Sequence, residues 1–157
     1  MLIILRLATI DDAKDLYAWR NDESSRIYSG NASEIPWLSH VSWLASRLER
    51  LSDEPFFIFT IGDLSIGMSR FDLYNESKDV FEISILINPD FRNLGYGSQI
   101  LQISCDVIAE IFPNYVLTAK VHVGNMISRN LFTRLGFRQR SQAGDFIILE
   151  KLLNNRQ

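Results

Sequence analysis

A glycine-containing turn between a predicted strand and a predicted helix is the segment of this sequence with the clearest chemical use. It reads Arg92-x-x-Gly95-x-Gly97. The first turn of a helix has main-chain N–H groups without internal partners, and glycines let a ligand approach the backbone closely. The helix dipole also favours negative charge at this end. We therefore expect a pyrophosphate group to bind here, although the same glycines could serve only the local backbone conformation.

Composition narrows the class of protein. The 157 residues are 46% hydrophobic and 22% charged, and we expect one globular domain over residues 1–157. The net charge of −3 gives no basic surface for nucleic acid, and no apolar run reaches the ~20 residues of a membrane span. The aromatic residues are numerous enough to form a core without a disulfide or a metal. These features predict a cytoplasmic protein with no metal and no nucleic-acid or membrane partner.

The elements that would position the turn follow from apolar periodicity. The pattern predicts an α/β (α+β) fold with a mixed central sheet of about seven strands and about four helices. Pro36 is expected to open a helix with Trp37 and Leu44 on its apolar stripe. The expected strands are residues 2–7, 56–61, 64–71, 80–87 and 115–123 and two that flank 143–145, and the expected helices begin near Thr9, Pro36, Ser98 and Met126.

A second motif, Asn125-x-x-Ser-x-x-Leu-Phe-x-x-x-Gly-Phe137, follows the turn. The turn lacks the Gly-Lys-Ser/Thr ending of a P-loop and the G-x-G-x-x-G spacing of a dinucleotide-binding turn. The two motifs together resemble those of the GNAT superfamily, and the predicted order of elements agrees with the GNAT fold over nearly the whole chain. The resemblance implies an N-acetyltransferase that moves an acetyl group from acetyl-CoA to a small-molecule amine, as a monomer or a homodimer.

The resemblance also implies where acetyl-CoA binds. In GNAT enzymes the fourth strand splays from the fifth, and the pantetheine arm pairs with the fourth strand like an added strand. The turn then holds the pyrophosphate, and the second motif contacts the cofactor from the other side. Asn125 has an equally good reading as a helix N-cap, and the two roles are compatible. The cofactor residues implied are Ile85, Leu86, Ile87, Arg92, Asn93, Leu94, Gly95, Tyr96, Gly97, Ser98, Asn125, Ser128 and Phe132.

Acetyl transfer needs a base for the ammonium, a donor for the oxyanion and a proton for the thiolate. The resemblance places Glu82 where many members use a carboxylate base, often through water, although a Glu there could instead be a buried partner of Arg or Lys. A main-chain N–H of the same strand is the expected oxyanion donor. Where many members have a Tyr as general acid, this chain has Phe132, which donates no proton. The thiolate then leaves unassisted, through water, or with help from a group such as Ser128 or Tyr96.

The amino-terminal half carries elements that resemble the nucleotide-sugar N-acetyltransferases of the pseudaminic-acid pathway, which acetylate the 4-amino group of a UDP-linked sugar. These are Trp-Arg-Asn-Asp at 19–22 and His-x-x-Trp at 40–43. Arginines suit a diphosphate, Trp37 or Trp43 could stack on a base or sugar, and a histidine could accept a proton. The acceptor residues implied are Arg20, Asn21, Arg26, His40 and Trp43.

Alternatives to the sugar acceptor stay open. Each acceptor residue also has a structural reading, with Trp43 in the core, Arg20 anchoring a helix, and His40 on the surface or hydrogen-bonded. A protein N-terminal acetyltransferase of the ribosomal-protein type would accept a peptide in the same place. A non-catalytic CoA-binding module is a further reading, suggested by Phe132. A site enclosed by arginines and aromatic rings favours the nucleotide sugar, and an open or acidic groove favours the peptide.

Overall fold

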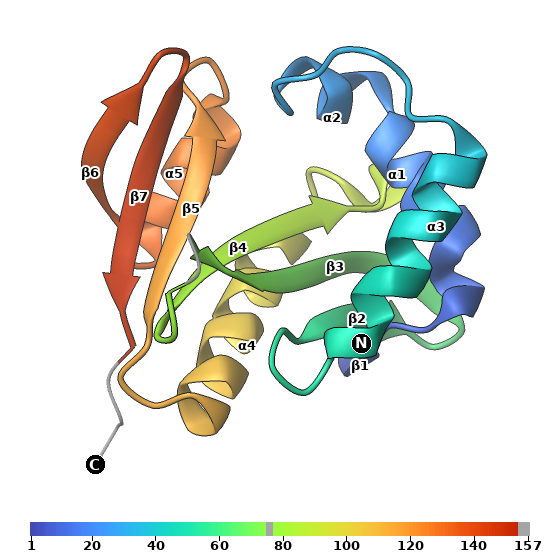
Figure 1. Ribbon diagram of the computed structural model, residues 1–157, viewed down its shortest axis with the longest axis horizontal. Helices are drawn as coiled ribbons and strands as arrows, with labels where there is room; N and C mark the ends of the chain where they lie inside the picture. The colour runs from blue at the N-terminus through green and yellow to red at the C-terminus, as the bar shows by residue number, and fades with distance from the viewer. Residues whose placement is uncertain (75–76, 154–157) are drawn as a thin grey trace.

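A seven-stranded mixed sheet with helices on both faces forms the fold, in a computed structural model that describes residues 1–74 and 77–153 (Figure 1). The spatial order of the strands is β1-β2-β3-β4-β5-β7-β6, and every neighbouring pair is antiparallel except β4 and β5. The predicted α/β fold is therefore confirmed. The strands are β1 (Ile4–Leu7), β2 (Phe56–Ile61), β3 (Leu64–Leu73), β4 (Val80–Ile87), β5 (Val116–His122), β6 (Arg138–Ala143) and β7 (Phe146–Leu152).

Four helices of nine residues or more correspond to the predicted ones, and a fifth is shorter. The short helix lies in residues 21–35, where no helix or strand is predicted from the sequence. It has no buried residue, so it has no apolar periodicity by which to predict it. The helices are α1 (Ala13–Asn21), α2 (Glu23–Ile27), α3 (Trp37–Arg47), α4 (Tyr96–Ile111) and α5 (Met126–Arg134).

Alternate side chains of the central strands enter two apolar cores. On one face α4 and α5 pack on a core that includes Phe71, Phe81 and Ile100, each 0% exposed. On the other face α1 and α3 pack on a smaller core that includes Leu16 and Leu44. The sheet is thus covered on both faces over β1–β4, which fixes its strand register.

The stripe predicted for α3 is only partly right. Leu44 is 0% exposed as expected, but Trp37 is 43% exposed. The other positions of α3 that are buried carry His40 and Arg47, both 1% exposed. Hydrogen bonds compensate the burial of the Arg47 guanidinium, and the His40 Nε2 lies 2.8 Å from the Ala13 carbonyl, whereas the His40 Nδ1 has no hydrogen-bond partner among the described residues. An apolar pattern does not reveal such polar contacts.

Candidate active site

The sheet opens between its two central strands. β4 and β5 run parallel and pair at three positions, of which the last joins Glu82 to Thr118. Residues 83–87 have no partner on β5 within the part of the chain that the structure describes, whereas β3 pairs with β4 from Phe81 to Ile87. Figure 1 shows the two strands diverging beyond this point. The splay expected from the resemblance is present, and it leaves one edge of β4 free inside the sheet.

Alternation along β4 decides which main-chain groups face the opening. The Asn88 N–H donates to the Ile66 carbonyl of β3 at 2.9 Å. In an antiparallel ladder every second residue makes such bonds, so the even-numbered residues 82–88 bond to β3. The N–H and C=O groups of Ile83, Ile85 and Ile87 therefore point the other way, toward β5. An extended amide chain placed in the opening would complete this ladder.

Of the three predicted pantetheine contacts, two present their main chain to the opening. Ile85 and Ile87 are in this group. Leu86 belongs to the set that bonds to β3, and its side chain packs against the smaller core. Leu86 therefore supports the strand, and its own N–H and C=O groups do not face the opening.

The predicted phosphate-binding turn closes β4 and begins α4. Gly95 is the helix N-cap at φ 83°, a left-handed conformation that favours glycine, and Asn93 has φ 62°. No side chain caps the helix, so the N–H groups that follow Gly95 keep no side-chain acceptor. Asn93, Leu94 and Gly95 are exposed, and Tyr96, Gly97 and Ser98 are half-buried. The turn therefore presents free donors and a helix N-terminus to solvent, as an anion site requires.

Arg92 joins this turn to the amino-terminal helices. Its guanidinium donates to an Asp22 carboxylate oxygen at 2.7 Å and to the Ser25 hydroxyl at 3.1 Å. The hydrogen bond from Arg92 lowers the pKa of Asp22. The side chain predicted to contact the cofactor thus ties the turn to α2 in this structure.

The second motif lies on α5. The Asn125 side-chain oxygen accepts from the Ser128 N–H at 3.2 Å, so the N-cap reading of Asn125 is confirmed. Gly136, at φ 93°, directly follows the last residue of the helix end, where a left-handed conformation favours glycine. Phe132 is 6% exposed with its ring centroid 5.0 Å from that of Phe137. Phe132 therefore lies in the core and offers little surface to a cofactor.

Glu82 lies on the sheet face that carries α1 and α3. It shares this face with Leu86 of the smaller core, since alternate residues of a strand point the same way. Burial is the main cause that raises the Glu82 pKa, and Lys120 and Arg70 act against it. Asp72, directly opposite on β3, raises it further. A carboxylate with a raised pKa is a better proton acceptor near neutral pH than an exposed one.

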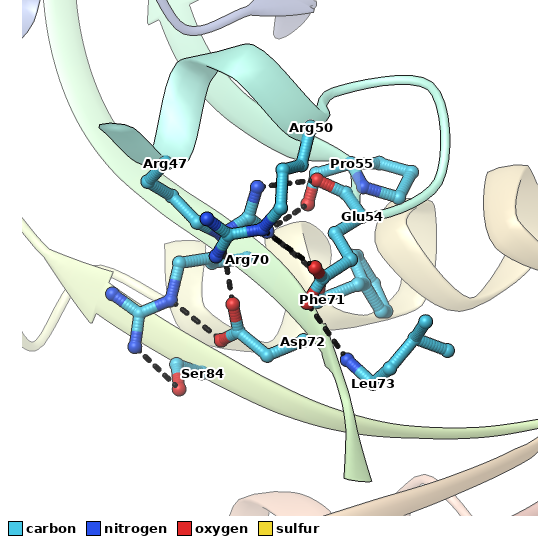
Figure 2. Close-up of polar contacts among 9 residues, drawn as sticks. All are labelled: Arg47, Arg50, Glu54, Pro55, Arg70, Phe71, Asp72, Leu73 and Ser84. Carbon is cyan, nitrogen blue, oxygen red and sulfur yellow. Dashed lines mark hydrogen bonds and ion pairs between the residues drawn. The ribbon is translucent and has the colours of Figure 1, made fainter. Parts of the chain in front are cut away.

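A buried arginine organises the carboxylate opposite Glu82. Arg47 donates to an Asp72 carboxylate oxygen at 2.8 Å and to the main-chain carbonyls of Glu54 and Phe71 at 2.6 and 2.8 Å. Figure 2 shows these contacts, with Arg70 donating to the second Asp72 oxygen at 2.8 Å. Burial raises the pKa of Asp72, but the two guanidinium groups outweigh it and the net shift is downward. Asp72 is therefore held as an anion.

Trp43 is surrounded by cations and rings. The guanidinium carbons of Arg20 and Arg70 lie 4.8 and 5.0 Å from its ring centroid. The centroids of His40 and Phe56 lie 6.0 and 6.2 Å away. Trp43 therefore supports two arginines, and these contacts leave less of the indole for the predicted stacking on a base or sugar.

The other three predicted acceptor residues make internal contacts. Asn21 exchanges hydrogen bonds with both main-chain groups of Ile35, at 2.9 and 3.3 Å. Arg26 donates to the carbonyls of Asn21 and Ala32. The His40 Nε2 lies 2.8 Å from the Ala13 carbonyl, and burial lowers the His40 pKa. In this conformation these side chains hold the 21–35 segment and α3 in place, and His40 at 1% exposure has no surface for an acceptor.

The segment after α2 reaches the far strands. The ring centroid of Tyr28 is 5.5 Å from that of His122 at the end of β5, and His122 is 5.4 Å from Phe146 of β7. Figure 1 shows this segment beside the tips of these strands. The Glu82 face is therefore bordered by α1 and α3 on one side and by Tyr28 and the end of β5 on the other.

Comparisons with known proteins agree with this geometry. Residues 3–138 match the family model described as the acetyltransferase (GNAT) domain. The chain belongs to the GNAT family. No curated protein sequence matches the chain significantly. As a family member it is an acetyl-CoA-dependent N-acetyltransferase, so the catalytic reading is favoured over a non-catalytic CoA-binding module.

Solved structures of other GNAT proteins share the fold. The chain is similar to spermidine N-acetyltransferase from Vibrio cholerae in complex with CoA and spermine, at 17% identity and TM-score 0.84, with 96% of this chain and 95% of that one covered. A ribosomal-protein-alanine N-acetyltransferase from Brucella melitensis matches at 20% identity and TM-score 0.80, covering 96% and 99%. A phosphinothricin acetyltransferase from Sinorhizobium meliloti in complex with AcCoA matches at 15% and 0.80, covering 98% and 90%. At these identities the likeness establishes the fold alone.

No group of three or more His, Cys, Asp or Glu side chains in residues 1–74 and 77–153 could hold a metal ion. Among the helices of these same ranges, none has the length and apolar character to cross a membrane.

Sequence reasoning missed three residues of the Glu82 face. Arg70 and Asp72 lie on β3, and Arg47 reaches them from α3. The sequence contained a signal for Arg70 and Asp72, because two charged residues that are two apart in an apolar strand share one face of the sheet. Nothing local marks Arg47, because its partners are far away in the sequence.

Proposed function

We propose that this acetyltransferase acetylates the amino group of a nucleotide-linked amino sugar, with Glu82 as general base. The observation that carries the proposal is the set of charges beside Glu82. Arg47 and Arg70 share one carboxylate, Asp72, and Lys120 is a further cation that acts on Glu82. Arg20, beside Arg70, has no ion-pair partner among residues 1–74 and 77–153, so cations outnumber anions on this face. Such a face suits an acceptor that carries phosphate and disfavours a polyamine.

Residues of β4 perform the chemistry in this proposal. The acetyl thioester supplies an activated carbonyl carbon when acetyl-CoA is bound. The Glu82 carboxylate removes a proton from the acceptor ammonium, directly or through water, which makes the nitrogen nucleophilic. The main-chain N–H groups of Ile85 and Ile87 face the opening, and one of them donates to the carbonyl oxygen as negative charge develops there.

The cofactor is held along the opening and the turn. The free edge of β4 pairs with the amides of the pantetheine arm, and the N–H groups after Gly95 bind the pyrophosphate. Since Phe132 lies in the core and donates no proton, the departing thiolate takes its proton from water. Ser128 and Tyr96 are half-buried residues of the two motifs and are the side chains to test as alternative proton donors.

A peptide N-terminus is the second candidate acceptor. The likeness in fold to a ribosomal-protein-alanine N-acetyltransferase is the observation that keeps it in view. The contact between Tyr28 and His122 closes one border of the Glu82 face, which favours a nucleotide sugar over a polypeptide acceptor.

Release of free thiol from acetyl-CoA tests the proposal. Purified protein is offered a UDP-linked 4-amino sugar, a panel of N-terminal peptides, and spermidine. Turnover on the sugar with little on the other two is expected, and turnover on peptides alone would refute the sugar acceptor. Glu82→Gln should abolish most of the activity, while Glu49→Gln, which changes an exposed carboxylate on the segment after α3, should not.

A further inference from the structure

One arginine on the Glu82 face has no counter-ion. Arg20 is half-buried, and it has neither a hydrogen-bond acceptor nor an ion-pair partner among residues 1–74 and 77–153. Arg70, by contrast, donates to Asp72 at 2.8 Å and to the Ser84 hydroxyl at 3.4 Å. Burial and the charge of Arg70 both lower the Arg20 pKa.

An unpaired guanidinium in this setting is unfavourable without a ligand. Burying a charge costs free energy unless a partner compensates it, and a second guanidinium nearby adds repulsion. Trp43 compensates in part, since its ring lies 4.8 Å from the Arg20 guanidinium carbon. The five N–H donors of the Arg20 guanidinium are suited to phosphate or carboxylate oxygens.

We propose that Arg20, positioned by Trp43 and with Arg70 beside it, binds a phosphate group of the acceptor. This inference rests on the proposed function, in which the acceptor amine lies at Glu82. Arg26, which the resemblance placed with Arg20 at the diphosphate, donates instead to two main-chain carbonyls. In this proposal Arg70 is the second arginine beside Arg20.

Calorimetry tests the anion site without catalysis. UDP, which has no amine, is titrated into protein saturated with CoA, so that the cofactor's own pyrophosphate site is filled. We expect UDP to bind, uridine not to bind, and Arg20→Gln to weaken UDP at least about tenfold, as loss of a charged hydrogen bond implies. Arg140→Gln removes an equal charge from the exposed strand β6 and should leave UDP affinity unchanged. No UDP binding by the wild type, or equal affinity in Arg20→Gln, would overturn the inference.

Kinetics separate this inference from the proposed function. The wild-type enzyme is offered the UDP-linked 4-amino sugar and the methyl glycoside of the same sugar, and we expect a lower KM for the first. Arg20→Gln should remove that preference, and circular dichroism melting confirms that the variant is folded. Turnover of both sugars with equal KM would refute the phosphate site and leave the function standing. UDP binding without turnover of either sugar would support the phosphate site and refute the proposed function.

Discussion

Replacing Arg47 with methionine tests whether the buried arginine organises the Glu82 face. Methionine fills a similar volume, so the change removes the charge and the donors with little loss of packing. It removes the Arg47 donors from the main-chain carbonyls of Glu54 and Phe71 and from one Asp72 oxygen, while the Pro55 carbonyl keeps the Phe71 N–H (Figure 2). Breaking a buried ion pair costs about 3–5 kcal/mol. Since Asp72 is 31% exposed and keeps Arg70, we expect the lower end, about 3 kcal/mol.

Urea unfolding followed by tryptophan fluorescence measures this loss. For a chain of this size about 3 kcal/mol corresponds to a fall in Tm of about 6–12 °C. Arg50→Met is the matched control, because Arg50 also pairs with a carboxylate but is 47% exposed, and it should cost about 0–1 kcal/mol. A loss below about 1 kcal/mol in Arg47→Met, with an unchanged m-value, would refute the reasoning.

Three further predictions concern protonation. Glu82→Gln should lower kcat by about 10²–10⁴ and remove the acid limb of the pH–rate profile. In the wild type that limb lies above the ordinary Glu range, because burial raises the pKa and activity falls as the carboxylate protonates; a limb at or below the ordinary range would contradict the assignment. Asp12→Asn should cost about 1–3 kcal/mol at neutral pH, since Asp12 accepts from Arg6 at 2.7 and 2.9 Å and from the Thr9 N–H at 2.8 Å. Although burial opposes it, the net shift lowers the Asp12 pKa, so this contribution is present at neutral pH and is lost as pH falls through that lowered pKa. Denaturation at pH 7 and pH 3 should therefore show a smaller stability difference between wild type and Asp12→Asn at pH 3. Cys105 is 3% exposed and burial raises its pKa to about 11, so iodoacetamide at pH 8 should modify it only after unfolding, and rapid labelling of the native protein would show the burial to be wrong.

Local signals gave the most reliable predictions from sequence. The turn at Gly95 and the cap at Asn125 are each fixed by residues within a few positions of one another. The helix predicted to begin near Thr9 is preceded by a 3-10 turn that starts with a capping box between Thr9 and Asp12. Such features depend on backbone conformation and short-range hydrogen bonds, which a single sequence encodes directly.

Long-range partners limited the prediction of the site. The sequence gives no sign that Arg47 on α3 meets Asp72 on β3, or that Trp43 lies between Arg20 and Arg70. The position of β7 between β5 and β6 likewise depends on pairing that no local pattern specifies. The fold class could therefore be predicted, while the charges around Glu82 required the three-dimensional arrangement.

The free edge of β4 has a consequence for association between molecules. An unpaired strand edge on a protein surface invites other chains to add to it and is a frequent origin of aggregation. Here residues 83–87 pair with β3 and lack a partner only on the side toward β5, in the middle of the sheet, with β1–β3 on one side and β5, β7 and β6 on the other. Recognition through the main chain also places little demand on the side chains at 85 and 87, so other β-branched residues should be tolerated there. The unpaired edge of β4 is thus accessible to a single extended chain inside the opening, but not to the edge strand of another sheet.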